Sequence, residues 1–143
     1  MNKRSEGIHM KSAFLVAIAG TFMTGIAHSS PPCENATSQA SLNECATQSM
    51  HRADAELNRL YHALTKSLKD DPEAERKLVA AQREWIKFRD SECSFQALKS
   101  EGGSANAMVL SMCLEDHTRT RMRSLRGYLE CKEGELYCGP LDQ

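Results

Sequence analysis

The sequence is poor in aromatic residues, which make up 6% of its 143 residues and include one tryptophan. Few aromatic side chains mean little buried area per residue, so a small domain of this composition needs other support. The sequence also lacks the alternation of apolar and polar residues that is typical of half-buried strands. It shows no internal repeat and no low-complexity tract. These absences exclude a β-rich or repeat fold and favour a helical one.

The chain has no strong excess of charge of either sign, with 18 Lys and Arg against 19 Asp and Glu. Removal of a 27-residue leader takes away three of the basic residues and one of the acidic ones, which leaves a net charge of −3. Such a protein is a poor candidate for nucleic-acid binding, which depends on a basic surface. A basic partner suits it better, although three charges produce only a weak steering field.

The first 27 residues have the composition of a cleavable signal peptide. Basic residues precede an uncharged apolar run over residues 13–26, and Gly25-Ile26-Ala27 fits the small-x-small cleavage rule. A bilayer span needs about 20 apolar residues, so a retained anchor is the less favoured alternative. The residues before Cys33 do not form a lipoprotein cleavage site. We therefore predict cleavage near Ala27 and a soluble periplasmic or secreted product without a membrane anchor.

All six cysteines lie after this leader, which is typical of disulfides in an exported protein. No Cys-x-x-Cys motif indicates a redox pair or a zinc knuckle. We expect each bridge to contribute roughly 2–4 kcal/mol to the stability of this aromatic-poor domain.

Apolar residues recur at helical spacing in three long segments. The first predicted helix opens at Ser41, where Glu44 completes a capping box. The second runs from Pro72 to about Ser100, because proline suits the first helical turn. The third is capped by Ser104 and ends near residue 131. The apolar stripe of the second helix comprises Leu78, Ala81, Trp85, Phe88, Phe95 and Leu98.

Two short turns between three long helices predict an all-α, up-down-up antiparallel three-helix bundle braced by disulfides. Residues 28–40 form an extended lead, residues 41–131 the helical domain and residues 132–143 a disulfide-tied tail. Reflection of the chain about its second turn places Cys93 level with Cys113. A Cys45–Cys93 bridge stays open as an alternative, since these two cysteines lie near the same end. The favoured pairs are Cys33–Cys45, Cys93–Cys113 and Cys131–Cys138.

Several polar residues lie on the apolar faces of the predicted helices. Reflection about the first turn brings Arg89 level with about Ala53, one residue from Asp54. One interpretation is a polar pocket between helices. The favoured one is a satisfied internal network, in which an Arg–Asp pair sets the helix register. The predicted network comprises Asp54, Asn58, Tyr61, Gln82, Trp85, Arg89, Thr118 and Arg121.

No motif in the sequence indicates catalysis or metal binding. The histidines of the helical segments lack the carboxylate or cysteine spacing that would complete a metal set. Disulfide-bonded cysteines cannot serve as nucleophiles. We therefore predict no catalytic residue, no metal and no cofactor. A hydrolase with a helix-borne carboxylate is the least favoured alternative and would need a deep pocket containing Asp54 with Glu56 or Asp116.

Two spaced motifs make the sequence recognisable. They are Asp54-x-x-Leu57-Asn58-x-x-Tyr61 and Gln82-x-x-Trp85-x-x-x-Arg89-x-x-x-Cys93. Together with Gly102-Gly103-Ser104, Cys113-Leu114 and the segment from Thr118 to Leu125, they resemble the lysozyme-inhibitor LprI N-terminal domain family. The resemblance covers about residues 33–130. It implies a small secreted or periplasmic helical domain of bacteria, in a family named after a lysozyme inhibitor.

From the resemblance and the charge we expect an exported, non-enzymatic binding protein of the cell envelope with a protein partner. Lysozyme inhibition is its most concrete form, by occlusion of the basic enzyme's cleft. The acidic turn Glu101-Gly102-Gly103 is the candidate contact. The resemblance supplies no inhibitory residues, and its namesake's lipid anchor does not carry over. The alternative function is a structural or assembly factor of the envelope with no lysozyme target.

Overall fold

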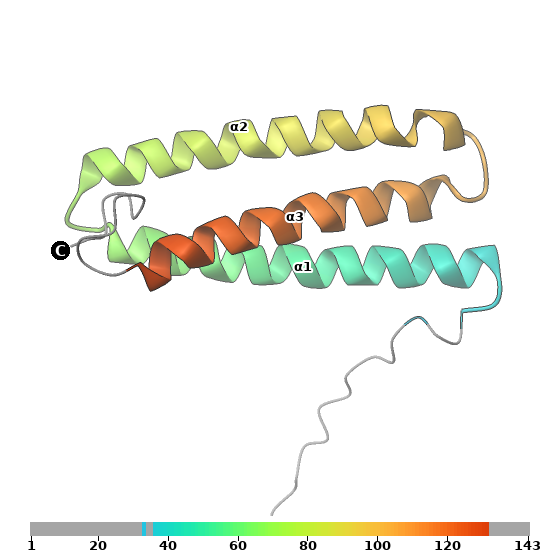
Figure 1. The fold of residues 1–143 in the computed structure, drawn as a ribbon, viewed down its shortest axis with the longest axis horizontal. Helices are drawn as coiled ribbons and strands as arrows, with labels where there is room; N and C mark the ends of the chain where they lie inside the picture. The colour runs from blue at the N-terminus through green and yellow to red at the C-terminus, as the bar shows by residue number, and fades with distance from the viewer. Residues whose placement is uncertain (1–32, 34–35, 132–143) are drawn as a thin grey trace, which may run out of the picture. The chain divides into compact units, whose positions relative to one another are not determined.

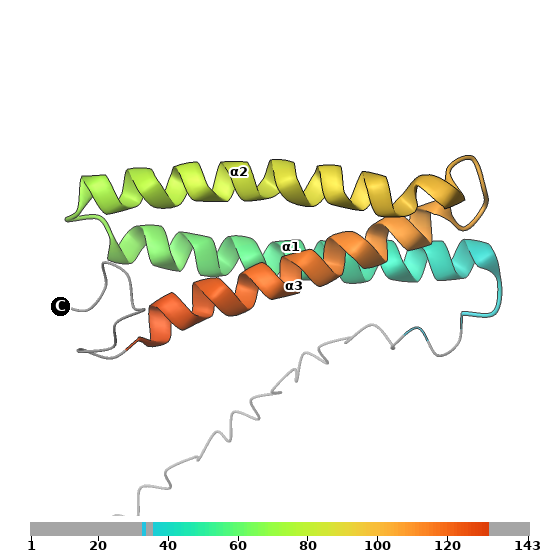
Figure 2. The ribbon, with the colours of Figure 1, turned by 45° about the horizontal axis from the view of Figure 1, so that its top comes forward.

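The fold is a bundle of three long antiparallel helices, seen in a computed structural model that describes residue 33 and residues 36–131. All of them belong to one compact unit, Pro31–Gln143. The helices are α1 (Gln39–Ser67), α2 (Pro72–Ala97) and α3 (Asn106–Glu130), and a short 3-10 turn, η2 (Leu98–Ser100), continues α2. Figures 1 and 2 show the up-down-up course. The predicted all-α bundle is thus confirmed, and the described residues contain no strand.

The predicted signal peptide and the tail after residue 131 lie outside the described residues. Within the described part of the chain, no helix has the length and hydropathy of a membrane span.

The helix starts differ from prediction at two of three positions. Ser38, not Ser41, caps α1: its extended backbone lets its Oγ accept the backbone N–H of Ser41 at 3.1 Å. The capping box is completed by the Ser41 hydroxyl, so residues 39 and 40 are helical rather than extended. Ser104 does not cap α3. The residue at the N-cap of α3 is Ala105, which has a helical backbone and no side-chain acceptor for a cap. Pro72 opens α2 as predicted.

The hydrophobic core lies mainly between α1 and α3. Leu57, Leu60 and Leu64 of α1 pack with Met122 and Leu125 of α3, and Leu125 is 0% exposed. Burial of a leucine side chain contributes about 1.5–3 kcal/mol, so this row accounts for much of the apolar stabilisation. The two helices run close together along their length (Figures 1 and 2).

Helix α2 packs differently, and its predicted apolar stripe is only partly buried. Phe88 is 54% exposed and Phe95 72%, and Leu98 is exposed too. The side chains that α2 does bury are Gln82, Cys93 and Ala97. The prediction of a buried stripe through Phe88, Phe95 and Leu98 was therefore wrong. The C-terminal end of α3 lies farther from α2 than its N-terminal end does (Figures 1 and 2). Only one side of α2 therefore meets the rest of the bundle.

Two predicted disulfides are confirmed. Cys33 pairs with Cys45 at a Cα–Cα distance of 5.8 Å, and Cys93 pairs with Cys113 at 5.5 Å. These pairings exclude the alternative Cys45–Cys93 bridge. Cys131 is also disulfide-bonded, and its predicted partner, Cys138, lies outside the described residues.

Candidate functional site

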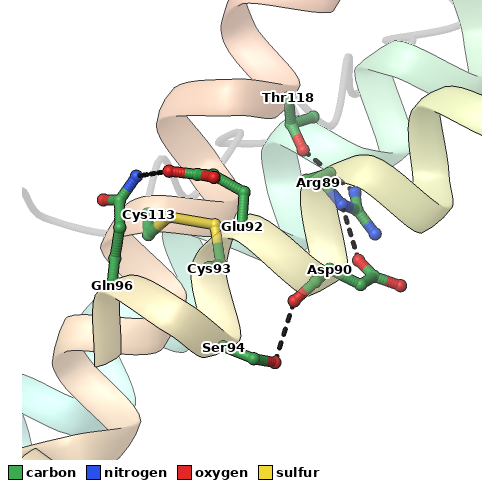
Figure 3. The surroundings of a disulfide bond; sticks show 8 residues. All are labelled: Arg89, Asp90, Glu92, Cys93, Ser94, Gln96, Cys113 and Thr118. Atoms are coloured by element: carbon green, nitrogen blue, oxygen red, sulfur yellow. Dashed lines mark hydrogen bonds and ion pairs between the residues drawn. A yellow bond between two sulfur atoms is a disulfide. The ribbon is translucent and has the colours of Figure 1, made fainter. Parts of the chain in front are cut away.

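A polar network joins the three helices at mid-bundle, and Figure 3 shows its contact between Arg89 of α2 and Thr118 of α3. The Nη1 of Arg89, on α2, donates to Asp54 Oδ1 of α1 at 2.8 Å and to Thr118 Oγ1 of α3 at 3.1 Å. The Arg89 Nε also donates to Asp90 Oδ1 at 3.0 Å. Thr118 is fully buried and the Arg89 side chain is 13% exposed. Because such charge-assisted bonds are directional, this contact sets the register of all three helices.

Trp85 lies beside the network, in contact with two arginines. The guanidinium carbons of Arg89 and Arg121 lie 5.1 and 6.0 Å from its ring centroid, within the range of cation–π contacts. The Arg121 Nε donates to Oε1 of the buried Gln82 at 3.0 Å. Burial lowers the pKa of Arg121, and the nearby Tyr128 opposes this shift weakly. The indole thus contacts one guanidinium group of its own helix and one of α3.

The structure brings together six of the eight residues predicted for the network. The other two are apart from it. Tyr61 packs against the hydrophobic core and its ring contacts His62. Asn58 is exposed. The reason is rotational: Leu57 and its neighbours at helical spacing turn the core face of α1 towards α3, and Asn58 lies about 100° around the helix from Leu57.

A groove of about 590 Å³ opens between the helices near the α1–α2 turn. Helix α1 supplies Leu64, its C-cap residue is Leu68, and α3 supplies Arg121 and Tyr128. Helix α2 and the preceding turn supply the remaining lining residues: Asp71, Glu73, Ala74, Lys77, Leu78 and Ala81. Sequence reasoning missed this groove, because it results from the divergence of α3 from α2 and no single helix carries a signal for it.

The carboxylates that a hydrolase would use do not line this groove. Asp54 is engaged by Arg89, and Glu56 is paired with Arg59 and Arg126. Arg59 lowers the pKa of Glu56, chiefly through its hydrogen bonds. A carboxylate with a lowered pKa stays ionised and is a poor general acid.

One set of potential metal ligands occurs among the described residues. The ligand atoms of Cys93, Cys113 and His117 lie within 4.8 Å of one another. Both sulfur atoms are engaged in the disulfide that Figure 3 shows. A metal would need them as thiolates, so the set serves as a covalent brace between α2 and α3.

The turn between α2 and α3 is exposed and internally bonded. Glu101, Gly102 and Gly103 are all exposed, and Gly102 adopts a φ of 74°, which favours glycine. The backbone N–H of Gly103 donates to the Ser100 carbonyl at 2.9 Å. Asn43 of α1 donates its Nδ2 to the Ser104 carbonyl at 2.8 Å. The turn is therefore tied to η2 and to the first part of α1.

The fold and its contacts define a disulfide-braced helical domain whose mid-bundle polar groups are satisfied internally. The sequence model of the family described as "Lysozyme inhibitor LprI" matches residues 33–125. A relative from Rhizobium meliloti (strain 1021), described as an uncharacterized protein, is 37% identical over 114 residues, which cover 72% of this chain and 82% of the relative. No solved structure matches the chain significantly. The chain belongs to the LprI lysozyme-inhibitor family.

Proposed function

We propose that this protein is an exported, non-enzymatic binding protein of the cell envelope, and that it inhibits lysozyme by occluding the enzyme's cleft. The family match over residues 33–125 is the observation that carries the proposal. The disulfides support export, because such bonds persist in oxidising compartments.

The α2–α3 turn is the part of the described surface best suited to enter a cleft. It is exposed, it carries the acidic Glu101, and the Cys93–Cys113 bridge braces the helices on either side of it. The Cys33–Cys45 bridge braces the start of α1, which contacts the turn through Asn43. A loop held in one conformation before binding loses little entropy on association. A carboxylate on such a loop complements the positive surface of a basic enzyme.

An inhibition assay tests the proposal directly. Protein expressed from the full chain and purified from the periplasm is titrated against c-type and g-type lysozymes. We expect inhibition that saturates at a defined molar ratio. No inhibition of either enzyme at a large molar excess would overturn the lysozyme proposal.

A charge reversal in the turn tests the contact itself. Glu101→Lys should weaken inhibition by about tenfold or more, since it places a positive charge against a basic enzyme. Glu130→Lys is the matched control, because this exposed residue makes the same charge change at the C-terminal end of α3. Equal inhibition by the two variants would show that the turn does not contact lysozyme. Inhibition would then have to use another surface.

The second candidate function is a structural or assembly factor of the envelope. The exposed aromatic side chains of Phe88 and Phe95 on α2 favour it, because apolar surface of this kind marks protein contacts. A pull-down from an envelope extract, with Phe88→Ser as the comparison, distinguishes the two functions. A specific envelope partner that is lost in the variant, without lysozyme binding, would favour the assembly role.

A further inference from the structure

The groove near the α1–α2 turn has apolar walls and a nearly neutral rim. The acidic groups of the rim are already engaged. Asp71 accepts the backbone N–H of Ala74 at 3.0 Å as the N-cap of α2. Glu73 pairs with Lys77 at 2.9 Å. Of the two basic side chains that line the groove, this leaves one without an ion pair.

That side chain is Arg121. It is half-buried, it donates its Nε to the neutral Gln82, and no carboxylate of the described residues lies within ion-pair distance of it. The neighbouring Arg89 provides a direct comparison, since both guanidinium groups contact Trp85. The charge of Arg89 is balanced by Asp54 and Asp90. A partly desolvated charge without a counter-ion is costly, and an anion bound in the groove would remove that cost.

The shape of the groove limits what the anion carries. Arg121 and Tyr128 are seven residues apart and share one face of α3, and the groove follows α2 from Ala74 to Ala81. Seven residues of helix correspond to about 10 Å. Leu64, Leu68 and Leu78 supply apolar surface along this length. A ligand with its anionic end at Arg121 therefore extends an apolar body towards the α1–α2 turn.

A peptide fits this lining poorly. Each peptide unit brings an N–H and a C=O group that need partners when they are buried. Beyond the paired rim, the groove offers only the Arg121 guanidinium and the Tyr128 hydroxyl as polar groups. An acyl chain has a single polar end and no such requirement.

We propose that this groove binds a medium-chain fatty acid, with its carboxylate on Arg121 and its acyl chain against Leu64, Leu68 and Leu78 towards the α1–α2 turn. The site is separate from the α2–α3 turn, so it goes beyond the proposed inhibition of lysozyme and does not depend on it. A guanidinium matches a carboxylate through paired N–H donors, which gives the site its preference for this head group.

The only tryptophan of the chain reports on the site, because the Arg121 guanidinium carbon lies 6.0 Å from the Trp85 ring centroid. The protein, expressed from the full chain and purified from the periplasm, is titrated with decanoate while its fluorescence is recorded. Decanol and decyltrimethylammonium serve as head-group controls below their aggregation limits. We expect saturable binding of decanoate that is at least about tenfold tighter than that of either control. The absence of saturable binding, or equal binding of all three, would overturn the proposal.

Two variants test the two halves of the site. Arg121→Gln should weaken decanoate binding by about tenfold or more and leave decanol binding unchanged. Arg123→Gln is the matched control, since this exposed arginine of α3 does not line the groove. Ala81→Phe fills the groove from an exposed backbone position and should abolish binding without touching Arg121. Ala81→Phe thus tests the groove even if Arg121→Gln loses its helical circular dichroism and is unfolded.

The results distinguish this proposal from the proposed function. Unchanged decanoate binding in a folded Arg121→Gln or Ala81→Phe protein would overturn the groove site. The lysozyme assay with the same variants reports separately on the α2–α3 turn. Since the groove lies at the other end of the bundle from this turn, we expect both variants to inhibit lysozyme as the unmodified protein does.

Discussion

The α1–α3 pair and helix α2 are held in the bundle by different forces. The pair shares a row of buried leucines, with Leu57, Leu60 and Leu64 against Leu125. Helix α2 buries one glutamine, one cysteine and one alanine, and it is attached through the Arg89 contacts and the Cys93–Cys113 bridge. The pair is stabilised mainly by buried apolar area, whereas α2 combines a few directional bonds with the partly buried apolar contacts of Ala74, Leu78 and Trp85. This difference explains both the exposed aromatic side chains of α2 and the groove beside it.

Truncation of the α1–α3 core should have the largest effect. Leu125→Ala removes a side chain that is 0% exposed, and its neighbours are held by both helices. Loss of apolar transfer energy plus the cavity left behind should cost about 4 kcal/mol. Urea unfolding followed by circular dichroism measures this loss. A loss below about 1 kcal/mol would contradict the assignment of the core to α1 and α3.

Removal of the covalent tie of α2 should have the next largest effect. The Cys93→Ser, Cys113→Ser double variant opens a bridge between residues 20 positions apart. Chain-entropy arguments give a cost of about 3 kcal/mol for a loop of this size. Guanidinium unfolding of the oxidised proteins measures it, and the Cys33→Ser, Cys45→Ser variant is the control, with a shorter separation of 12. An equal or larger loss in the control would show that the α2 bridge is not the more important one.

Loss of the mid-bundle ion pair should have an intermediate effect that is confined to α2. Arg89→Met removes the guanidinium that donates to Asp54 and Thr118 and leaves Asp54 only the 3.3 Å hydrogen bond from the Thr118 hydroxyl, at a cost of about 2 kcal/mol. Native-state hydrogen exchange should show faster exchange along α2 than along α1 and α3. Arg83→Met, at an exposed position of the same helix, should change neither the free energy of unfolding nor the hydrogen exchange of α2. Uniformly faster exchange in all three helices would mean that Arg89 supports the core and not α2 alone.

Substitution on the outer face of α2 should have the smallest effect. Phe95 is 72% exposed, so Phe95→Ser should change the free energy of unfolding by no more than about 0.5 kcal/mol. The same urea titration measures it. A loss comparable to that of Leu125→Ala would show that Phe95 is covered in solution, for example by a second copy of the chain.

Some errors of the sequence predictions have clear physical origins. The spacing of Phe88, Phe95 and Leu98 with Trp85 indicates one helical stripe, and periodicity alone cannot tell whether a neighbouring helix reaches that stripe. Ser41 and Ser104 are both acceptable caps by residue type. The choice depends on backbone conformation, which is extended at Ser38 and helical at Ala105.

The sequence by itself determined the three helices and their antiparallel order, and it favoured two disulfide pairs that the structure contains. These follow from local periodicity, turn residues and the symmetry of a hairpin, all of which depend on distances along the chain. It also brought Arg89 level with about Ala53, one residue from Asp54, because reflection about a short turn preserves register.

Only the tertiary structure decided which side of α2 is buried, that Asn58 faces solvent, and that a groove opens beside Arg121. The reason is that these properties depend on how α3 diverges from α2. The divergence results from the summed packing of all three helices, and no residue pattern within one helix specifies it.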